Sequence, residues 1–194
     1  MISTSLAAKL VKSFASLPGY PRDTPEAITA LAEPLAAVSD EDHAKRAAKL
    51  YRVEAFTDEA PELLFEEPDE RFNLEIFRSR SGAFLFLVTA SHTTTEFHVV
   101  EAETPRAPFR MLAGRLQDHE YEVDHQGGRF LIRTNDRGRN FRLVTAPVSD
   151  PREANWKELI AHRPEVAIEG VEPFAHHIVV LEREQGLPHL RVLD

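Results

Sequence analysis

The stretch GGRFLIRTNDRGRNFRLVTAP, residues 127–147, concentrates the side chains best suited to holding an anion. Its arginines flank or occupy a polar turn between two apolar runs, and they are Arg129, Arg133, Arg137, Arg139 and Arg142. Guanidinium groups bind carboxylates through paired hydrogen bonds, so this cluster would suit an anion or an acidic peptide. The alternative is a solvated hairpin whose arginines pair with nearby acids, and the formal net charge of −9 favours that alternative.

The nine histidines raise the question of a metal site. In the run HEYEVDH, His119 and His125 fall on one side of an expected strand, six residues apart. Such a separation is about 20 Å along an extended chain, too far for both rings to bind one ion. His176 and His177 are adjacent and are predicted to face opposite sides of a strand. We therefore predict structural or surface roles for these side chains, with no metal and no cofactor.

A serine nucleophile of the hydrolase type follows the pattern G-x-S-x-G. No serine in the chain has a glycine two positions before it. The acidic run EEPDE, residues 66–70, is predicted to be a solvated turn rather than a pair of catalytic carboxylates. We accordingly predict no catalytic residues in this chain.

Composition limits the remaining possibilities. At 194 residues with 42% hydrophobic side chains, the chain is long enough for one globular domain, or one domain with an appendage. Its negative charge argues against a nucleic-acid partner. The absence of cysteine excludes disulfides and suits a reducing compartment, so we expect a cytoplasmic protein. No apolar run approaches the ~20 residues of a membrane-spanning helix, and no membrane partner is expected.

Residues 1–46 are predicted to be a short helical segment. The first turns, MISTSLAAKLVKSFASL, have apolar residues near helical spacing, and a transit peptide is the alternative. Thr24 before a proline suits the start of a helix. Ser39 and Asp42 suit a capping box. The helix that they would begin carries Ala44, Ala47 and Ala48.

From about residue 49 the sequence repeats itself. Four kinds of short run recur in the same order: LYRVEA, FHVVEA and FRLVTA at 50, 97 and 141; PELLFE, PFRMLA and NWKELI at 61, 108 and 155; FNLEI, YEVDH and VAIEG at 72, 121 and 166; and AFLFLV, RFLIRT and HIVVLE at 83, 129 and 177. The run LRVLD at 190 begins a further copy. A repeat of about 45 to 50 residues holding four strands is typical of a β-propeller blade.

The apolar pattern supports stacked sheets. Phe84–Val88 and Phe130–Ile132 are apolar at consecutive positions, which predicts strands buried on both faces. The polar residues 135–140 are then a hairpin loop, with 91–96 in the corresponding place one repeat earlier. Trp156 is predicted to pack in the core or between blades. The predicted fold is mainly β: a partial β-propeller of about three four-stranded antiparallel blades, preceded by the helical N-terminal segment.

Seven motifs within this repeat resemble the propeller domain of the oligopeptidase B group in the prolyl oligopeptidase family of serine peptidases. They are EEPDERF (66–72), RSRSGAFLFL (78–87), SHTTTE (91–96), YEVDH (121–125), RFLIRTND (129–136), NFRLVTAP (140–147) and LEREQGL (181–187). The resemblance implies a propeller that covers an α/β-hydrolase domain carrying a Ser–Asp–His triad. It also implies cleavage of small peptides after Arg or Lys, with the propeller restricting access.

The resemblance divides the chain into residues 1–46, of unknown origin, and residues 47–194, a partial propeller. It implies a substrate-gating portion that lacks the hydrolase domain and is non-catalytic alone, with that domain and small basic peptides as partners. Open blade faces predict self-association. Two alternatives remain: a free-standing protein-interaction module, and a complete hydrolase with an unrecognised site.

Overall fold

A computed structural model describes residues 36–38, 47–53, 58 and 60–194, which form strands in four antiparallel sheets. The chain divides into two compact units, residues 1–74 and residues 75–194. In the described ranges, no helix is long and apolar enough to cross a membrane.

The first unit contains a three-stranded sheet in the order β1-β2-β3, comprising β1 (Ala36–Val38), β2 (Lys49–Arg52) and β3 (Glu62–Glu66). Most of the predicted N-terminal helical segment lies outside the described residues. Where the structure does describe this region, the helix prediction is wrong: Ala36–Val38 is a strand, and Ala47 and Ala48 belong to no helix. Their carbonyls accept hydrogen bonds from the distant backbone N–H groups of Leu74 and Glu67 rather than from the next helical turn.

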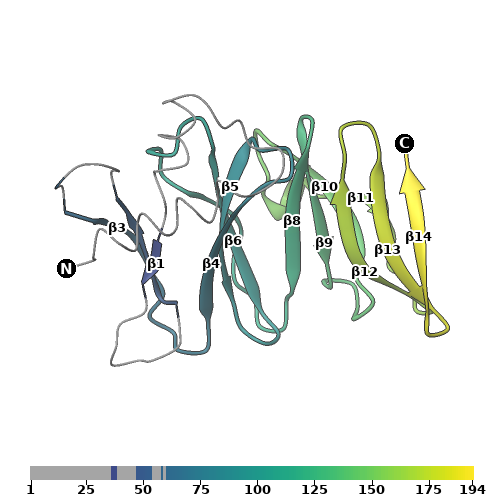
Figure 1. Ribbon diagram of the computed structural model, residues 1–194. Coiled ribbons are helices and arrows are strands. Elements are labelled where there is room, and N and C mark those ends of the chain that lie inside the picture. Colours follow the sequence, from purple (N-terminus) through teal and green to yellow (C-terminus); the bar gives the residue numbers. More distant parts are fainter. Residues whose placement is uncertain (1–35, 39–46, 54–57, 59) are drawn as a thin grey trace. The chain divides into compact units, whose positions relative to one another are not determined.

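Three further sheets follow one another in chain order in Figure 1. The β4–β7 sheet comprises β4 (Asn73–Arg78), β5 (Phe84–Ala90), β6 (Thr95–Glu101) and β7 (Arg110–Ala113). The β8–β11 sheet comprises β8 (Tyr121–Gln126), β9 (Arg129–Thr134), β10 (Arg142–Pro147) and β11 (Lys157–Ile160). The β12–β14 sheet comprises β12 (Val166–Pro173), β13 (Ile178–Glu184) and β14 (Leu187–Leu193). Each sheet is one uninterrupted stretch of chain, and Glu153–Asn155 adds a single 3-10 turn.

The predicted strands are confirmed, whereas the grouping is confirmed only in part. Two sheets have four strands and two have three, against an expectation of about three four-stranded blades. The repeat written from residues 50, 97 and 141 also starts inside a sheet, at β2, β6 and β10, because the later sheets themselves begin at β4, β8 and β12. Periodicity defines the length of a repeat but not the strand at which each sheet begins.

The sheets pack face to face because their middle strands are apolar on both sides. On β9, Phe130 and Ile132 belong to the core shared with the β4–β7 sheet, whereas Leu131 belongs to the core shared with the β12–β14 sheet. Alternate side chains of a strand point to opposite faces, so one strand serves two interfaces. The consecutive apolar runs in the sequence therefore predicted the stacking correctly.

Candidate functional site

The first strands of the three stacked sheets lie close together at one edge of the stack. β4, β8 and β12 are each the edge strand of their sheet. The backbone N–H of Arg80, in the turn after β4, donates to Asp124 Oδ1 on β8 at 2.9 Å. The guanidinium of the same residue lies 2.5 Å from Glu172 Oε2 on β12. In a stack of blades, the edges that converge in this way line the central channel, and we call β4, β8 and β12 the channel wall.

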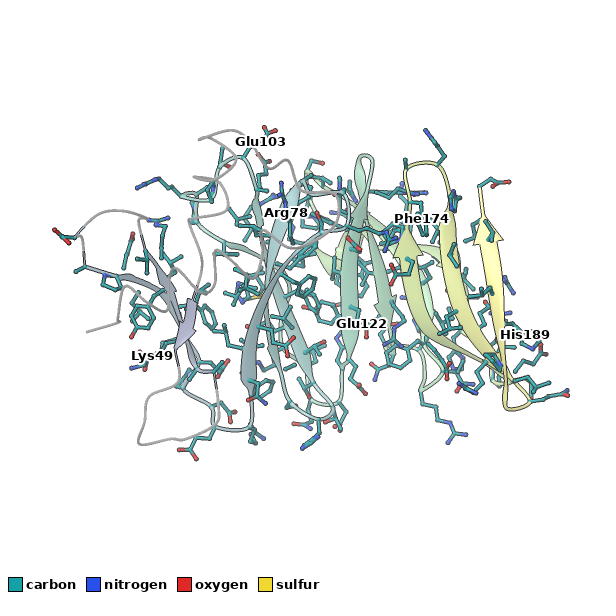
Figure 2. The ribbon with its side chains drawn as sticks, viewed as in Figure 1. Lys49, Arg78, Glu103, Glu122, Phe174 and His189 are labelled. Carbon is teal, nitrogen blue, oxygen red and sulfur yellow. The ribbon has the colours of Figure 1, made fainter. Side chains whose placement is uncertain are left out.

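The channel wall is rich in carboxylates. They are Glu75, Glu122, Asp124, Glu169 and Glu172. Arginines pair with some of them: Arg133 with Glu122 at 2.6 Å, and Arg183 with Glu169 at 2.5 Å. Figure 2 labels Glu122 on β8 and Phe174 after β12. The wall therefore carries more acidic than basic groups on its three strands.

Burial changes the titration of two neighbouring residues on this wall. It raises the pKa of Asp124, although backbone N–H groups of Arg80 and His125 donate to the carboxylate and oppose the shift. It lowers the pKa of His125, whose Nδ1 lies 2.8 Å from Ser81 Oγ. Both shifts follow from the cost of holding a charge away from water.

A cavity of about 410 Å³ opens along the wall. Its lining includes Glu75, Phe77, Phe97, Asp124, Arg133 and Val171. The ring of Phe77 is 40% exposed and packs edge-on at 6.1 Å from the ring of Phe97. An aromatic surface beside carboxylates complements a cationic side chain with an apolar stem, such as that of Lys or Arg in a peptide.

The arginine-rich hairpin between β9 and β10 is held together by its own ion pairs. Arg142 binds both carboxylate oxygens of Asp136 at 2.7 Å and Glu158 at 3.1 Å. Arg129 donates to Gln126 Oε1, and Arg133 is occupied by Glu122. The predicted pairing with acids is therefore confirmed for Arg133 and Arg142, whereas Arg129 binds a neutral amide oxygen. Arg137 and Arg139 are exposed at the tip of the hairpin.

The turn in that hairpin depends on a glycine. Gly138 has a φ of 145°, and a Cβ at this position would lie 2.5 Å from His162 Nε2. A side chain would be strained there and would also collide with the histidine ring. The predicted hairpin loop over residues 135–140 is thus confirmed.

His119 and His125 have structural contacts, as predicted. His119 is buried with Nε2 2.8 Å from Thr134 Oγ1, and the ring of His125 lies 4.6 Å from Phe84. His176 and His177 do not lie on a strand as predicted, because β12 ends at Pro173 and the chain turns through them before β13. The described ranges contain no group of three or more potential metal ligands.

Two further predictions have clear outcomes. Trp156 packs against the core between the β4–β7 and β8–β11 sheets, 6.0 Å from Tyr121, as predicted. The acidic run at 66–70 is not fully solvated: Glu67 is buried, and its carboxylate accepts the backbone N–H of Asp69. Its short hydrogen-bonded loop draws this side chain inward.

No chemical pattern in the sequence singles out Arg80. It stood only within the motif RSRSG, although it is the residue that joins the edges of three sheets. Its partners are far away in the sequence, so no local spacing points to them.

Face-to-face antiparallel sheets with converging first strands define a segment of a β-propeller. The sequence matches the model of the prolyl oligopeptidase N-terminal β-propeller domain over residues 36–194. The chain therefore belongs to the prolyl oligopeptidase family, as the motifs predicted.

Individual relatives of this chain are named as peptidases, in agreement with the family match. Dipeptidyl aminopeptidase BI of Pseudoxanthomonas mexicana is 41% identical over 132 residues, covering 68% of this chain and 18% of the relative. Protease 2 of Moraxella lacunata is 31% identical over 153 residues, covering 78% of this chain and 22% of the relative. The structure of oligopeptidase B from Trypanosoma brucei matches with a TM-score of 0.69 and 25% identity, over 76% of this chain and 21% of that one. The chain thus spans about a fifth of the length of these relatives.

Proposed function

We propose that this chain is the substrate-gating propeller portion of an oligopeptidase B-like serine peptidase that cleaves small peptides after Arg or Lys. The acidic channel wall carries the proposal. Carboxylates on β4, β8 and β12 attract basic peptides, and the narrow convergence of these strands limits what can pass. Chemistry belongs to a partner α/β-hydrolase domain, and this chain alone is non-catalytic.

Peptide binding tests the filter. We expect a fluorescent Arg- and Lys-containing peptide to bind residues 1–194 more tightly than an acidic peptide of equal length, and the difference to shrink with added salt. Glu75→Gln, on the cavity wall, should weaken binding of the basic peptide. Glu103→Gln is the matched control because Glu103 is exposed and lies outside the cavity lining. Equal binding of the two peptides would refute the charge filter.

Turnover tests the non-catalytic role. The pure chain should leave an Arg- or Lys-ester substrate intact. Hydrolysis that a serine-reactive phosphonate abolishes would instead identify a complete hydrolase.

The exposed apolar face of the β12–β14 sheet favours a second candidate function, that of a protein-interaction module. On β13, Ile178 and Val180 face the β8–β11 sheet, so the alternate residues point the other way. Leu181, Leu190 and Val192 on that outer face are 36%, 72% and 59% exposed. The charges that accompany them, Arg183 and Glu169, already pair with each other. We propose that another sheet covers this face, and that preparations of residues 1–194 self-associate through it.

Sedimentation velocity tests self-association. We expect Leu190→Asp to shift the chain toward monomer at micromolar concentrations. Leu187→Asp is the control, because Leu187 is also strongly exposed, at 63%, but lies at the β13–β14 turn. A monomeric unmodified chain would contradict this part of the proposal.

A further inference from the structure

The turn Ser79–Gly82, between β4 and β5, touches both sheets that follow it. Towards the β8–β11 sheet, the backbone N–H of Arg80 donates to Asp124 and Ser81 Oγ lies 2.8 Å from His125 Nδ1. These two contacts fix the turn against the first strand of the neighbouring sheet.

The side chain of Arg80 continues to the sheet after that. Its Nη1 lies 2.5 Å from Glu172 Oε2, and its guanidinium carbon lies 4.3 Å from the centre of the Phe174 ring. Phe174 in turn stacks on His177, with ring centres 4.6 Å apart. The β12–β13 turn is thus gripped by an ion pair and a cation–π contact from a residue two sheets away.

The β8–β11 sheet holds the same β12–β13 turn from a second direction. Gln126 Nε2, at the end of β8, donates to the carbonyls of Phe174 at 2.7 Å and His177 at 3.1 Å. The turn is therefore tied to the ends of both preceding first strands.

The turn that presents Arg80 is itself well defined. Ser79 is buried and its Oγ accepts the backbone N–H of Phe84. Arg78 Nε donates to the carbonyl of Gly82, whose φ of 76° favours glycine. Because these bonds fix its backbone, the turn holds Arg80 in one position.

We propose that this turn is a clamp, with Arg80 as its positioning residue, that restrains the β12–β13 turn and limits how far the channel wall opens. The Arg80 and Glu172 side chains are 45% and 60% exposed, so the pair adds little to global stability. We expect the pair to act instead on local opening of the β12–β13 turn, which costs less free energy than unfolding the whole protein. That the clamp sets peptide access rests on the proposed gating function, whereas the clamp itself rests on these contacts.

Hydrogen exchange of the 194-residue chain tests the clamp. We expect Arg80→Ala to speed exchange of the backbone amides between Phe174 and Ile178 by about three- to tenfold, because their local opening becomes easier. Arg152→Ala is the matched control. It removes the same charge, but Arg152 pairs with Asp150 only two residues away and 2.6 Å distant. Exchange between 174 and 178 that is the same in both variants would overturn the proposal.

A second variant covers the case in which Arg80→Ala speeds exchange in all three sheets alike. Glu172→Gln removes the ion pair from the opposite side and keeps the side-chain shape. Faster exchange confined to the β12–β13 turn in this variant would support the clamp, and unchanged exchange would overturn it. Failure of the unmodified chain to bind basic peptides would refute the gating function while leaving the exchange result, and hence the clamp, intact.

Discussion

The two faces of the β8–β11 sheet are packed with different chemistry. Against the β4–β7 sheet the core is aromatic, with Phe84, Phe86 and Phe130 in edge-to-face contact. Against the β12–β14 sheet the core is a smaller aliphatic cluster, comprising Leu131, Leu143, Ile160, Ile168, Ile178 and Val180. The aromatic interface buries larger side chains and therefore supplies more of the apolar stabilisation.

The aliphatic interface, which buries less apolar surface, also contains polar contacts. Arg133 pairs with Glu122 on β8, donates to the carbonyl of Ile168 on β12 at 3.0 Å, and lies 3.9 Å over the ring of Phe141. Buried Glu182 on β13 forms an ion pair with Arg163, which lies between β11 and β12, and a second one with Arg191 inside its own sheet. Such directional contacts fix the position of one sheet against the next more than they add to stability. One interface thus supplies strength, and the other supplies alignment at the channel wall.

The largest expected effect comes from truncating the centre of the aromatic interface. Phe130 is fully buried, with its ring 5.1 Å from Phe84 and 6.0 Å from Phe86. Phe130→Ala should reduce the free energy of unfolding by about 3–5 kcal/mol, because it removes the apolar contacts and leaves a cavity. Urea unfolding measures this loss, with exposed Leu187→Ala as control. A loss below ~1 kcal/mol would contradict the conclusion that the aromatic interface supplies more of the apolar stabilisation.

The corresponding change in the aliphatic interface should cost less. Ile168 is buried in the cluster on β12. Ile168→Ala should reduce the free energy of unfolding by about 2–4 kcal/mol by the same two contributions. The same urea measurement applies. If this variant lost more stability than Phe130→Ala, the ranking of the two interfaces would be reversed.

A hydroxyl at the aromatic interface separates hydrogen bonding from packing. Tyr121 Oη donates to the carbonyl of Ala113 and accepts the backbone N–H of Phe97, each at 2.9 Å. Tyr121→Phe keeps the ring but leaves two buried backbone groups without this partner, so we expect a loss of about 1–3 kcal/mol. Thermal and urea unfolding should agree on the value. An unchanged stability would show that these backbone groups find other partners.

The smallest effect is expected from pH at the arginine-rich hairpin. Burial opposes ionisation of Asp136, but hydrogen bonds and charge from Arg142 outweigh it, and the pKa of Asp136 is lowered. A carboxyl group whose pKa is lower in the folded state stabilises the protein at pH values above its unfolded-state pKa. This stabilisation is lost as the pH falls through the folded-state pKa. The stability difference between the unmodified chain and Asp136→Asn should therefore be constant above about pH 5 and shrink below about pH 4. A difference that persists undiminished at pH 3 would contradict the assignment.

The sequence predicted the features that depend on local alternation. Runs such as Phe84–Val88 identified strands with two buried faces, and Trp156 was correctly placed between sheets. It could not give the strand at which each sheet begins, because a repeat reads the same from any starting point. His176 and His177 lie in a turn rather than on a strand because β12 ends at Pro173 and β13 begins only at Ile178. The Arg80 contacts were missed because Glu172 is 92 residues away and meets it only after two sheets have stacked.

The contiguity of each sheet along the chain has a consequence for synthesis. Since the strands of the β4–β7, β8–β11 and β12–β14 sheets pair with their neighbours in the chain, each of these three sheets can form as the polypeptide leaves the ribosome. The aromatic seam would then form while the residues from Val166 onward are still being added. The β12–β14 sheet would then pack last, through the more polar interface, onto two sheets already held together by their phenylalanines.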